Sequence, residues 1–168
     1  MATRAFFGPP RNGPVEGGLQ VSVHLVPVWD GRLLIFDVDA APVRGRWLPW
    51  AVIDYGQNPY EAASILADDW LGVALSDLSL ADVLSIEGVA GGWELAIVFR
   101  AELAAPATGD AQRHPVLCER GAYDAIGSFD PIDLQRWVER GPADSVAAGG
   151  TALAEETAPV PGSPGLLF

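Results

Sequence analysis

The alternation of apolar and polar residues predicts β-strands over much of the chain. Residues 21–29 and 32–38 are rich in β-branched and aromatic side chains, and Asp30-Gly31 between them is typical of a tight hairpin turn. Residues 82–89 and 93–103 predict two more strands. In the last of these strands, one set of apolar side chains is expected to form the buried face: Trp93, Leu95, Ile97, Phe99, Ala101 and Leu103.

Between these strands, the sequence from Asn58 to Gly72 has a helical period. Asn58 is a favourable N-cap, Pro59 suits the first helical position and Gly72 is a common stop. The predicted helix is apolar on two faces, so we expect a partner to cover the second face. That face consists of Ile65, Leu66, Trp70 and Val73, and the candidate covers are Phe6-Phe7, residues 166–168 and a second copy of the chain.

A second capped helix is predicted towards the end of the domain. Asp130, Pro131 and Asp133 repeat the cap, proline and acid that begin the first helix, and the helix should end near residue 139. Residues 105–118, which include His114, are expected to form a polar exposed loop. The predicted organisation is a flexible N-terminal arm at 1–18, one domain at 19–140 and a flexible acidic tail, rich in Pro, Gly and Ala, at 141–168.

Composition and charge limit the possible partners. The chain has 168 residues, enough for one domain with a buried core, and its formal net charge is −12. Nucleic-acid backbones and anionic membrane surfaces would therefore be repelled, and no apolar run reaches the ~18 residues of a membrane span. The N-terminal residues lack the apolar stretch of a secretory signal, and Cys118 is the single cysteine, so we expect a cytoplasmic protein. His24 stands alone in its strand and is expected to be a hydrogen-bonded sheet residue.

Several residues around the first predicted helix follow a family spacing: Leu48-Pro49, Gly56, Asn58-Pro59, Glu61-Ala62-Ala63, Asp69 and Leu71-Gly72-Val73. This pattern resembles the Nudix box, the loop-helix-loop motif of pyrophosphohydrolases that cleave nucleoside diphosphates linked to another moiety. The order of predicted elements over residues 21–138 is also similar to that of a whole Nudix domain. The resemblance implies a single Nudix-like α/β/α sandwich with a mixed β-sheet and, in an active member, Mg²⁺ held by carboxylates of the helix.

The box departs from the family pattern where the metal is bound. Ala51 stands in place of a glycine, and Gln57 stands in place of the first glutamate. Ile65, Leu66 and Trp70 replace an arginine and two glutamates. Because Mg²⁺ prefers oxygen ligands, these apolar side chains cannot take over the role of the lost carboxylates.

Two functions are open at this point. The first is a Nudix-fold protein with a degraded catalytic box, which binds a small molecule or a protein partner without catalysis, a second copy of the chain being one candidate partner. No cofactor is expected for it. The remodelled pocket predicted for a ligand consists of Trp50, Ile65, Leu66, Asp69 and Trp70.

The alternative is a divergent metal-dependent pyrophosphohydrolase of nucleoside diphosphate-X compounds, with Mg²⁺ as its cofactor. Its candidate catalytic residues are Asp69, Asp68 and Glu87, and its candidate metal ligands are Asp69, Asp68 and Asp54. This function requires that three carboxylates meet at one ion, with bonds of about 2.0–2.6 Å. The structural interpretation of Glu87 is instead a cross-strand partner of Arg100.

Overall fold

The structure is a computed structural model that describes residues 19–40, 43–87 and 92–140. The predicted arm and tail, with Phe6-Phe7 and residues 166–168, lie outside the described residues. In the described part, strands and helices follow in this order: β1 (Leu19–Trp29), β2 (Arg32–Ala40), β3 (Val43–Trp47), β4 (Trp50–Val52), α1 (Pro59–Leu71), β5 (Leu75–Glu87), β6 (Trp93–Leu103), β7 (Arg113–Leu117) and α2 (Pro131–Glu139).

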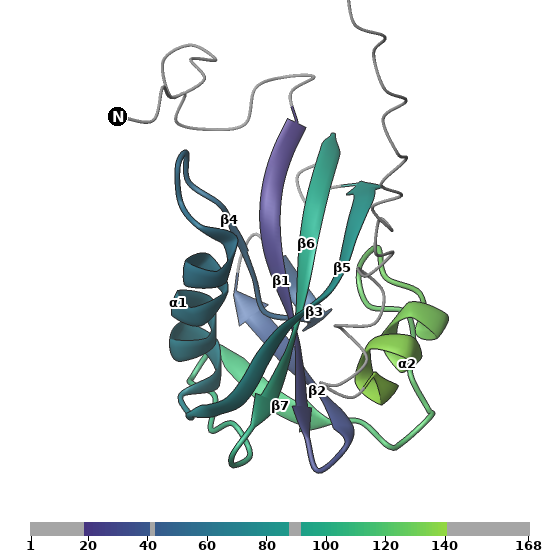
Figure 1. Ribbon diagram of the computed structural model, residues 1–168. Helices are drawn as coiled ribbons and strands as arrows, with labels where there is room; N and C mark the ends of the chain where they lie inside the picture. Colours follow the sequence, from purple (N-terminus) through teal and green to yellow (C-terminus); the bar gives the residue numbers. More distant parts are fainter. Residues whose placement is uncertain (1–18, 41–42, 88–91, 141–168) are drawn as a thin grey trace, which may run out of the picture.

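The strands form one mixed sheet between two helices. The main path runs β3-β2-β1-β6-β5, with β4 added beside β1 and β7 beside β2. β1 and β6 are parallel, from Leu19 opposite Trp93 to Val28 opposite Glu102, and the other pairs are antiparallel. Figure 1 shows α1 on one side of the sheet and α2 on the other. The predicted α/β/α sandwich with a mixed sheet is therefore confirmed.

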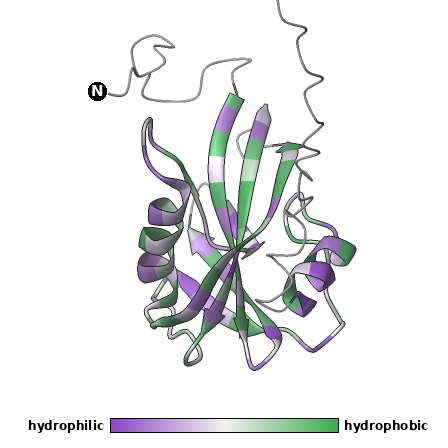
Figure 2. Ribbon diagram, in the orientation of Figure 1, coloured by the Kyte–Doolittle hydropathy of each residue, from purple (hydrophilic) through white to green (hydrophobic). Residues whose placement is uncertain are grey.

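Each helix covers its own core. Val23, Leu25 and Phe36 pack with the buried side of α1. On the other face, Val26 and Trp137 belong to the core beneath α2. Figure 2 shows the corresponding alternation of hydrophobic and hydrophilic residues along the strands. Burial of these apolar side chains on both faces is what holds the helices against the sheet.

Both helices begin and end as the sequence predicts. The Asn58 side chain accepts a hydrogen bond from the Tyr60 N–H at 2.8 Å, and Asp130 accepts one from the Asp133 N–H at 2.9 Å. Gly72 ends α1 with φ +61°, a left-handed conformation that glycine adopts without strain. These caps fix where α1 starts and where its last turn lies, which places Asp69 near the end of the helix.

The second apolar face predicted for α1 is smaller than expected. Ala62 and Leu66 are buried together with Ala63, so both predicted sides contribute to one broad buried face. Ile65 is 55 % exposed and is the part of the second face that remains open, whereas Trp70 is half-buried against the core. Because α1 has one broad buried face instead of two opposite apolar faces, it needs less contact with a further segment or partner.

Three predictions that concern β5 and β7 were wrong. β7 lies within residues 105–118, which were predicted to be a loop, and β5 begins at Leu75 rather than at residue 82. Glu87 pairs with Trp93 across the sheet, and Arg100 pairs with Ser79, so the predicted Glu87–Arg100 pair does not form. No helix in the described ranges is both long and apolar enough to cross a lipid bilayer.

Candidate functional site

The last turn of α1 carries an ion-pair cluster at the position of the family's metal site. Arg113 of β7 places Nη1 2.6 Å from Asp69 Oδ2 and Nη2 2.6 Å from Asp110 Oδ2. Its guanidinium lies over the Trp70 ring, 4.9 Å from the centroid, and Trp70 in turn meets Phe36 edge-to-face at 5.4 Å. Asp69 is thus bound to a side-chain cation that rests on an aromatic face.

The electrostatics of this cluster favour its charged form. The hydrogen bond from Arg113 to Asp69 raises the pKa of the guanidinium above its ordinary value. The pKa of Asp110 is lowered, first by the hydrogen bond from the Gln112 N–H and then by the one from Arg113. Because arginine keeps its charge over all ordinary pH values, Asp69 and Asp110 share one permanent side-chain cation.

The residues of the box do not fit Mg²⁺. Leu66 is 4 % exposed and lies in the core, while Ile65 and Asp68 point to solvent. Trp70 holds Arg113 rather than a hard cation. Among residues 19–40, 43–87 and 92–140, no group of three or more His, Cys, Asp or Glu side chains could hold a metal ion.

The other predicted acids lie elsewhere. Asp54 is exposed in the loop before α1, where its N–H donates to the Gln57 side chain at 3.2 Å and its carbonyl accepts from the Gln57 N–H at 3.0 Å. Glu87 ends β5, and its carbonyl accepts a hydrogen bond from the Ser128 hydroxyl at 2.9 Å. The structure therefore does not bring Asp54 and Glu87 together with Asp69.

The predicted ligand pocket is also separated into parts. Trp50 stands opposite His24 on β4 and β1, and the two rings stack at 6.4 Å. Trp70 packs on Phe36 in the core of α1. The two tryptophans do not form one platform, because His24 faces the α2 side of the sheet, where it contacts Phe129.

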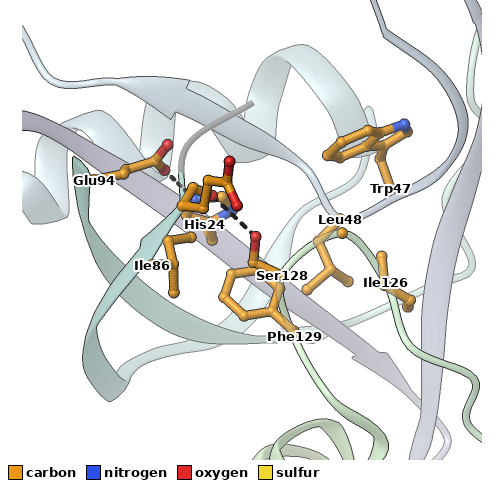
Figure 3. Close-up of a pocket in the computed structure, with 10 residues that line it drawn as sticks. His24, Trp47, Leu48, Ile86, Glu94, Ile126, Ser128 and Phe129 are labelled. Atoms are coloured by element: carbon orange, nitrogen blue, oxygen red, sulfur yellow. Dashed lines mark hydrogen bonds and ion pairs between the residues drawn. The ribbon is translucent and has the colours of Figure 1, made fainter. Parts of the chain in front are cut away.

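A cavity of about 230 Å³ lies on this α2 side. Figure 3 shows His24 and Glu94 meeting at one side of the pocket, with Trp47, Leu48 and Ile126 at the other. The wall is mostly apolar, and its polar groups come from β1, β5, β6 and the loop before α2. The lining residues are His24, Trp47, Leu48, Ile86, Glu87, Glu94, Ile126, Gly127, Ser128 and Phe129.

A buried polar cluster forms one wall of the pocket. His24 Nε2 lies 2.9 Å from Glu94 Oε1 and 3.1 Å from Ser22 Oγ, and the Ser22 hydroxyl donates to the same carboxylate oxygen. Ser22, His24 and Glu94 are 0, 5 and 1 % exposed. The three side chains thus form one buried hydrogen-bonded cluster around Oε1 of Glu94.

The opposite wall is fixed by a tight loop. Ile126 and Phe129 exchange two backbone hydrogen bonds of 3.0 Å, and Gly127 between them has φ +57°. A Cβ on Gly127 would lie 3.2 Å from Cζ3 of Trp47, so glycine is needed for both the turn and the close approach. Phe129 meets Trp137 of α2 edge-to-face at 5.3 Å, which ties the loop to the core.

A second cavity, of about 250 Å³, adjoins β2 and β7. It is lined in part by Arg46, Cys118, Tyr123 and Asp124. Burial raises the pKa of the Cys118 thiol, which leaves it protonated and poorly reactive at neutral pH. Arg46 lies 3.6 Å from Asp37 and 3.7 Å from Asp124, so its charge is already compensated. The His24–Glu94 pocket is the stronger candidate of the two.

This pocket was not predicted from the sequence, although two signals were present. His24 and Glu94 are polar residues in largely apolar strands, and both occupy the side of their strand that faces α2. They are far apart in the sequence and come to one face of the sheet because β1 and β6 pair in parallel, with His24 opposite Val98 and Gln20 opposite Glu94. Ser22 lies between these two rows and contacts both side chains.

The fold is that of solved Nudix proteins. A MutT NUDIX hydrolase from Burkholderia pseudomallei is 22% identical with a TM-score of 0.59, over 71% of this chain and 98% of that chain. The MutT protein from Methanosarcina mazei Go1 is 14% identical with a TM-score of 0.60, over 74% and 96%. The NUDIX domain of Shewanella oneidensis NrtR, solved with ADP ribose, is 14% identical with a TM-score of 0.56, over 71% and 86%.

The sequence alone finds no such relative. No family model matches the chain, and no curated protein matches it either. The Nudix resemblance is therefore confirmed at the level of the fold by structural similarity. At these identities the comparison describes the arrangement of strands and helices and not the activity.

Proposed function

We propose that this chain is a non-catalytic Nudix-fold protein that binds a small planar molecule in the pocket beside His24 and Glu94. The observation that carries the proposal is the pairing of Asp69 with Arg113 at 2.6 Å. It leaves the one remaining acid of the family's metal site engaged by a resident cation. Leu66, buried in the core, supplies no oxygen in place of the lost ligand.

The chemistry of the pocket favours a neutral or positively charged ligand. Glu87 and Glu94 line it, and none of the described residues in its wall is an arginine. The charged oxygens of a diphosphate would meet carboxylates there, with no arginine among these residues to offset the charge. A flat ring with N–H donors would instead pack against Trp47 and Phe129 and donate to the acidic wall.

The size of the pocket agrees with a ring rather than a whole dinucleotide. About 230 Å³ is below the roughly 300–1,000 Å³ of sites for drug-sized molecules, and the apolar surfaces of Leu48, Ile86 and Ile126 account for much of its wall. The buried Ser22–His24–Glu94 cluster is ordered before a ligand arrives. Preorganised polar groups reduce the entropy lost on binding.

Calorimetric titration with adenosine, guanosine and ADP-ribose tests this function. We expect a nucleoside to bind and ADP-ribose to bind at least about tenfold more weakly, because two phosphates approach an acidic wall. Ile86→Trp should abolish nucleoside binding by filling the pocket. The matched control Ile132→Trp, at a position that is 77 % exposed on α2, should leave it unchanged.

Two results would contradict the proposal. Tighter binding of ADP-ribose than of either nucleoside would show that the phosphates are recognised. Equal nucleoside affinity in Ile86→Trp and the unmodified chain would place the ligand outside the pocket.

A further inference from the structure

One face of the sheet is open where β1 and β6 begin. Leu19 is 48 % exposed and Trp93 is 57 % exposed, and Val83 of the neighbouring β5 is 49 % exposed. On the opposite face of the same strands, Glu94 and Ala96 are 1 and 0 % exposed. The α2 side of the sheet is thus covered at this end, and the α1 side is not.

The exposed side chains form one continuous surface. Leu19 pairs with Trp93, and Val83 pairs with Ile97, so these residues share a face of the sheet. Figure 1 shows the ends of β1 and β6 extending beyond both helices. We call this surface the open patch, and it consists of Leu19, Val21, Val83, Trp93, Leu95 and Ile97.

The open patch continues the apolar core on the α1 side of the sheet. Ile97 packs against the α1-side core, and Tyr60 of the first turn of α1 covers Phe99, with ring centroids 4.7 Å apart. The Trp93 indole N–H donates to the Ser85 hydroxyl, which satisfies its polar atom and leaves the ring as apolar surface. The exposed Ser85, opposite Leu95, is a polar residue on the same face. An exposed cluster of large apolar side chains is typical of a surface that another segment covers.

We propose that the segment formed by residues 1–18 covers the open patch, with Phe6 and Phe7 packed on Trp93 and Val83. This segment lies outside the described residues and leads directly into Leu19, which is itself part of the patch. The proposal concerns the face opposite the His24–Glu94 pocket, so it stands or falls independently of the function proposed above.

The length and composition of the segment suit this path. Residues 8–18 separate Phe7 from Leu19 and could span at most about 36 Å, several times the distance across three strands at ~4.8 Å spacing. They include Gly8-Pro9-Pro10, Gly13-Pro14 and Gly17-Gly18, which allow the chain to reverse direction. Phe6 and Phe7 are then close enough in the chain to contact the open patch, which includes Leu19 at the start of β1.

Charge favours residues 1–18 over the other possible covers. The segment carries Arg4 and Arg11 against one acid, Glu16, whereas the whole chain has a net charge of −12. Residues 141–168 end in an apolar Leu166-Leu167-Phe168, but their charged side chains are acids only. A second copy of a chain with this charge would also be repelled.

Limited trypsin digestion of the full chain tests the docking through cleavage after Arg11. We expect Phe6→Ser/Phe7→Ser to be cleaved roughly fivefold or more faster than the unmodified chain, because proteolysis follows the population of the undocked segment. Val83→Asp should have the same effect. The matched control Val52→Asp changes a valine that is also 49 % exposed but lies on β4, and it should be cleaved like the unmodified chain.

Thermal denaturation of the same variants gives a second measurement. If Phe6-Phe7 pack on Val83, the effects of Phe6→Ser/Phe7→Ser and Val83→Asp on the melting temperature will not add in the combined variant. Equal cleavage in all variants, or additive melting shifts, would overturn the proposal. A dimer by light scattering that Val83→Asp dissociates and Phe6→Ser/Phe7→Ser does not would overturn it in favour of a second copy.

Discussion

The contacts of Asp69 are made with a side-chain cation, Arg113. The resemblance places Asp69 among the acids that bind Mg²⁺ in an active box, yet here its carboxylate lies 2.6 Å from Arg113. The same guanidinium binds Asp110 and stacks on Trp70. Trp70, which occupies the place of a glutamate, thus contributes the aromatic surface on which the resident cation rests.

The first prediction concerns Asp110 and acid. Its pKa is lowered in the folded state, so the stabilisation from its charged form is complete above about pH 4 and is lost as the pH falls through the folded pKa. Asp110→Asn removes this contribution. Melting temperatures should therefore differ between the unmodified chain and Asp110→Asn at pH 6, and the difference should shrink at pH 3.

The control for this experiment is Glu119→Gln, which removes one acidic charge at an exposed position away from Arg113. The difference in melting temperature between Glu119→Gln and the unmodified chain should not shrink in this way between pH 6 and pH 3. A difference between the unmodified chain and Asp110→Asn that grows on acidification would contradict the assigned direction of the shift.

At the scale of elements, the helices were predictable and the strand details were not. Asn58 and Asp130 are local signals, since each cap acts on an N–H two or three residues away. β5 contains register shifts between Leu75 and Asp77 and between Leu80 and Asp82, which interrupt the period of two. The strand therefore begins earlier than its alternation indicated.

Two further strand assignments depended on tertiary contacts. β7 contains Pro115 and pairs only with β2 among the described strands, and such an edge position tolerates a proline. In β6, alternation predicted the face of Trp93 as the well-buried one, but near the start of the strand Glu94 is buried and Trp93 is exposed. Hydropathy alone misleads here, because the buried face contains a satisfied carboxylate and the open face a tryptophan.

The second prediction concerns the loop that closes the His24–Glu94 pocket. Gly127→Ala introduces strain at φ +57° and a Cβ contact of 3.2 Å with Trp47. We expect it to lower the free energy of unfolding by about 1–3 kcal/mol in urea denaturation. Gly121→Ala is the matched control: φ is +73°, and a Cβ there would meet nothing within 4 Å.

Comparing Gly127→Ala with Gly121→Ala separates the two causes of the decrease in the free energy of unfolding. Gly121→Ala measures the strain of a left-handed alanine alone, so the additional loss in Gly127→Ala is due to the contact with Trp47. Equal losses in the two variants would mean that the indole moves away at no cost. The loop would then be less rigid than its paired hydrogen bonds indicate.

For the whole molecule, the sequence predicted the sandwich but not where its pocket lies. Apolar runs and capped helices determine the layers locally, and Figure 1 shows the layers that follow from them. The pocket forms where β1, β6 and the loop at residues 126–129 come into contact, and no local sequence pattern predicts that tertiary contact. The family spacing predicted a site at α1, whereas the candidate ligand pocket is on the α2 face of the sheet.

The third prediction concerns turnover and Mg²⁺ in the full chain. Hydrolysis of ADP-ribose, dinucleoside polyphosphates and nucleoside triphosphates should remain at the level without protein, because Asp69 holds Arg113 and Leu66 is buried. The melting temperature should be the same in 5 mM Mg²⁺ and in EDTA. By linkage, a site with a dissociation constant of about 10 μM would add about 3–4 kcal/mol at that concentration, enough to raise the melting temperature by several degrees.

A matched pair of variants makes this result decisive. Asp69→Asn keeps the shape of the side chain and removes its charge, and Asp68→Asn does the same at the exposed neighbour outside the Arg113 pair. EDTA-sensitive product formation that Asp69→Asn abolishes and Asp68→Asn retains would show that the acid leaves Arg113 to bind a metal during turnover. If all three chains form no product and show no Mg²⁺-dependent shift, the result agrees with an Asp69 that stays paired with Arg113 and binds no Mg²⁺ under these conditions.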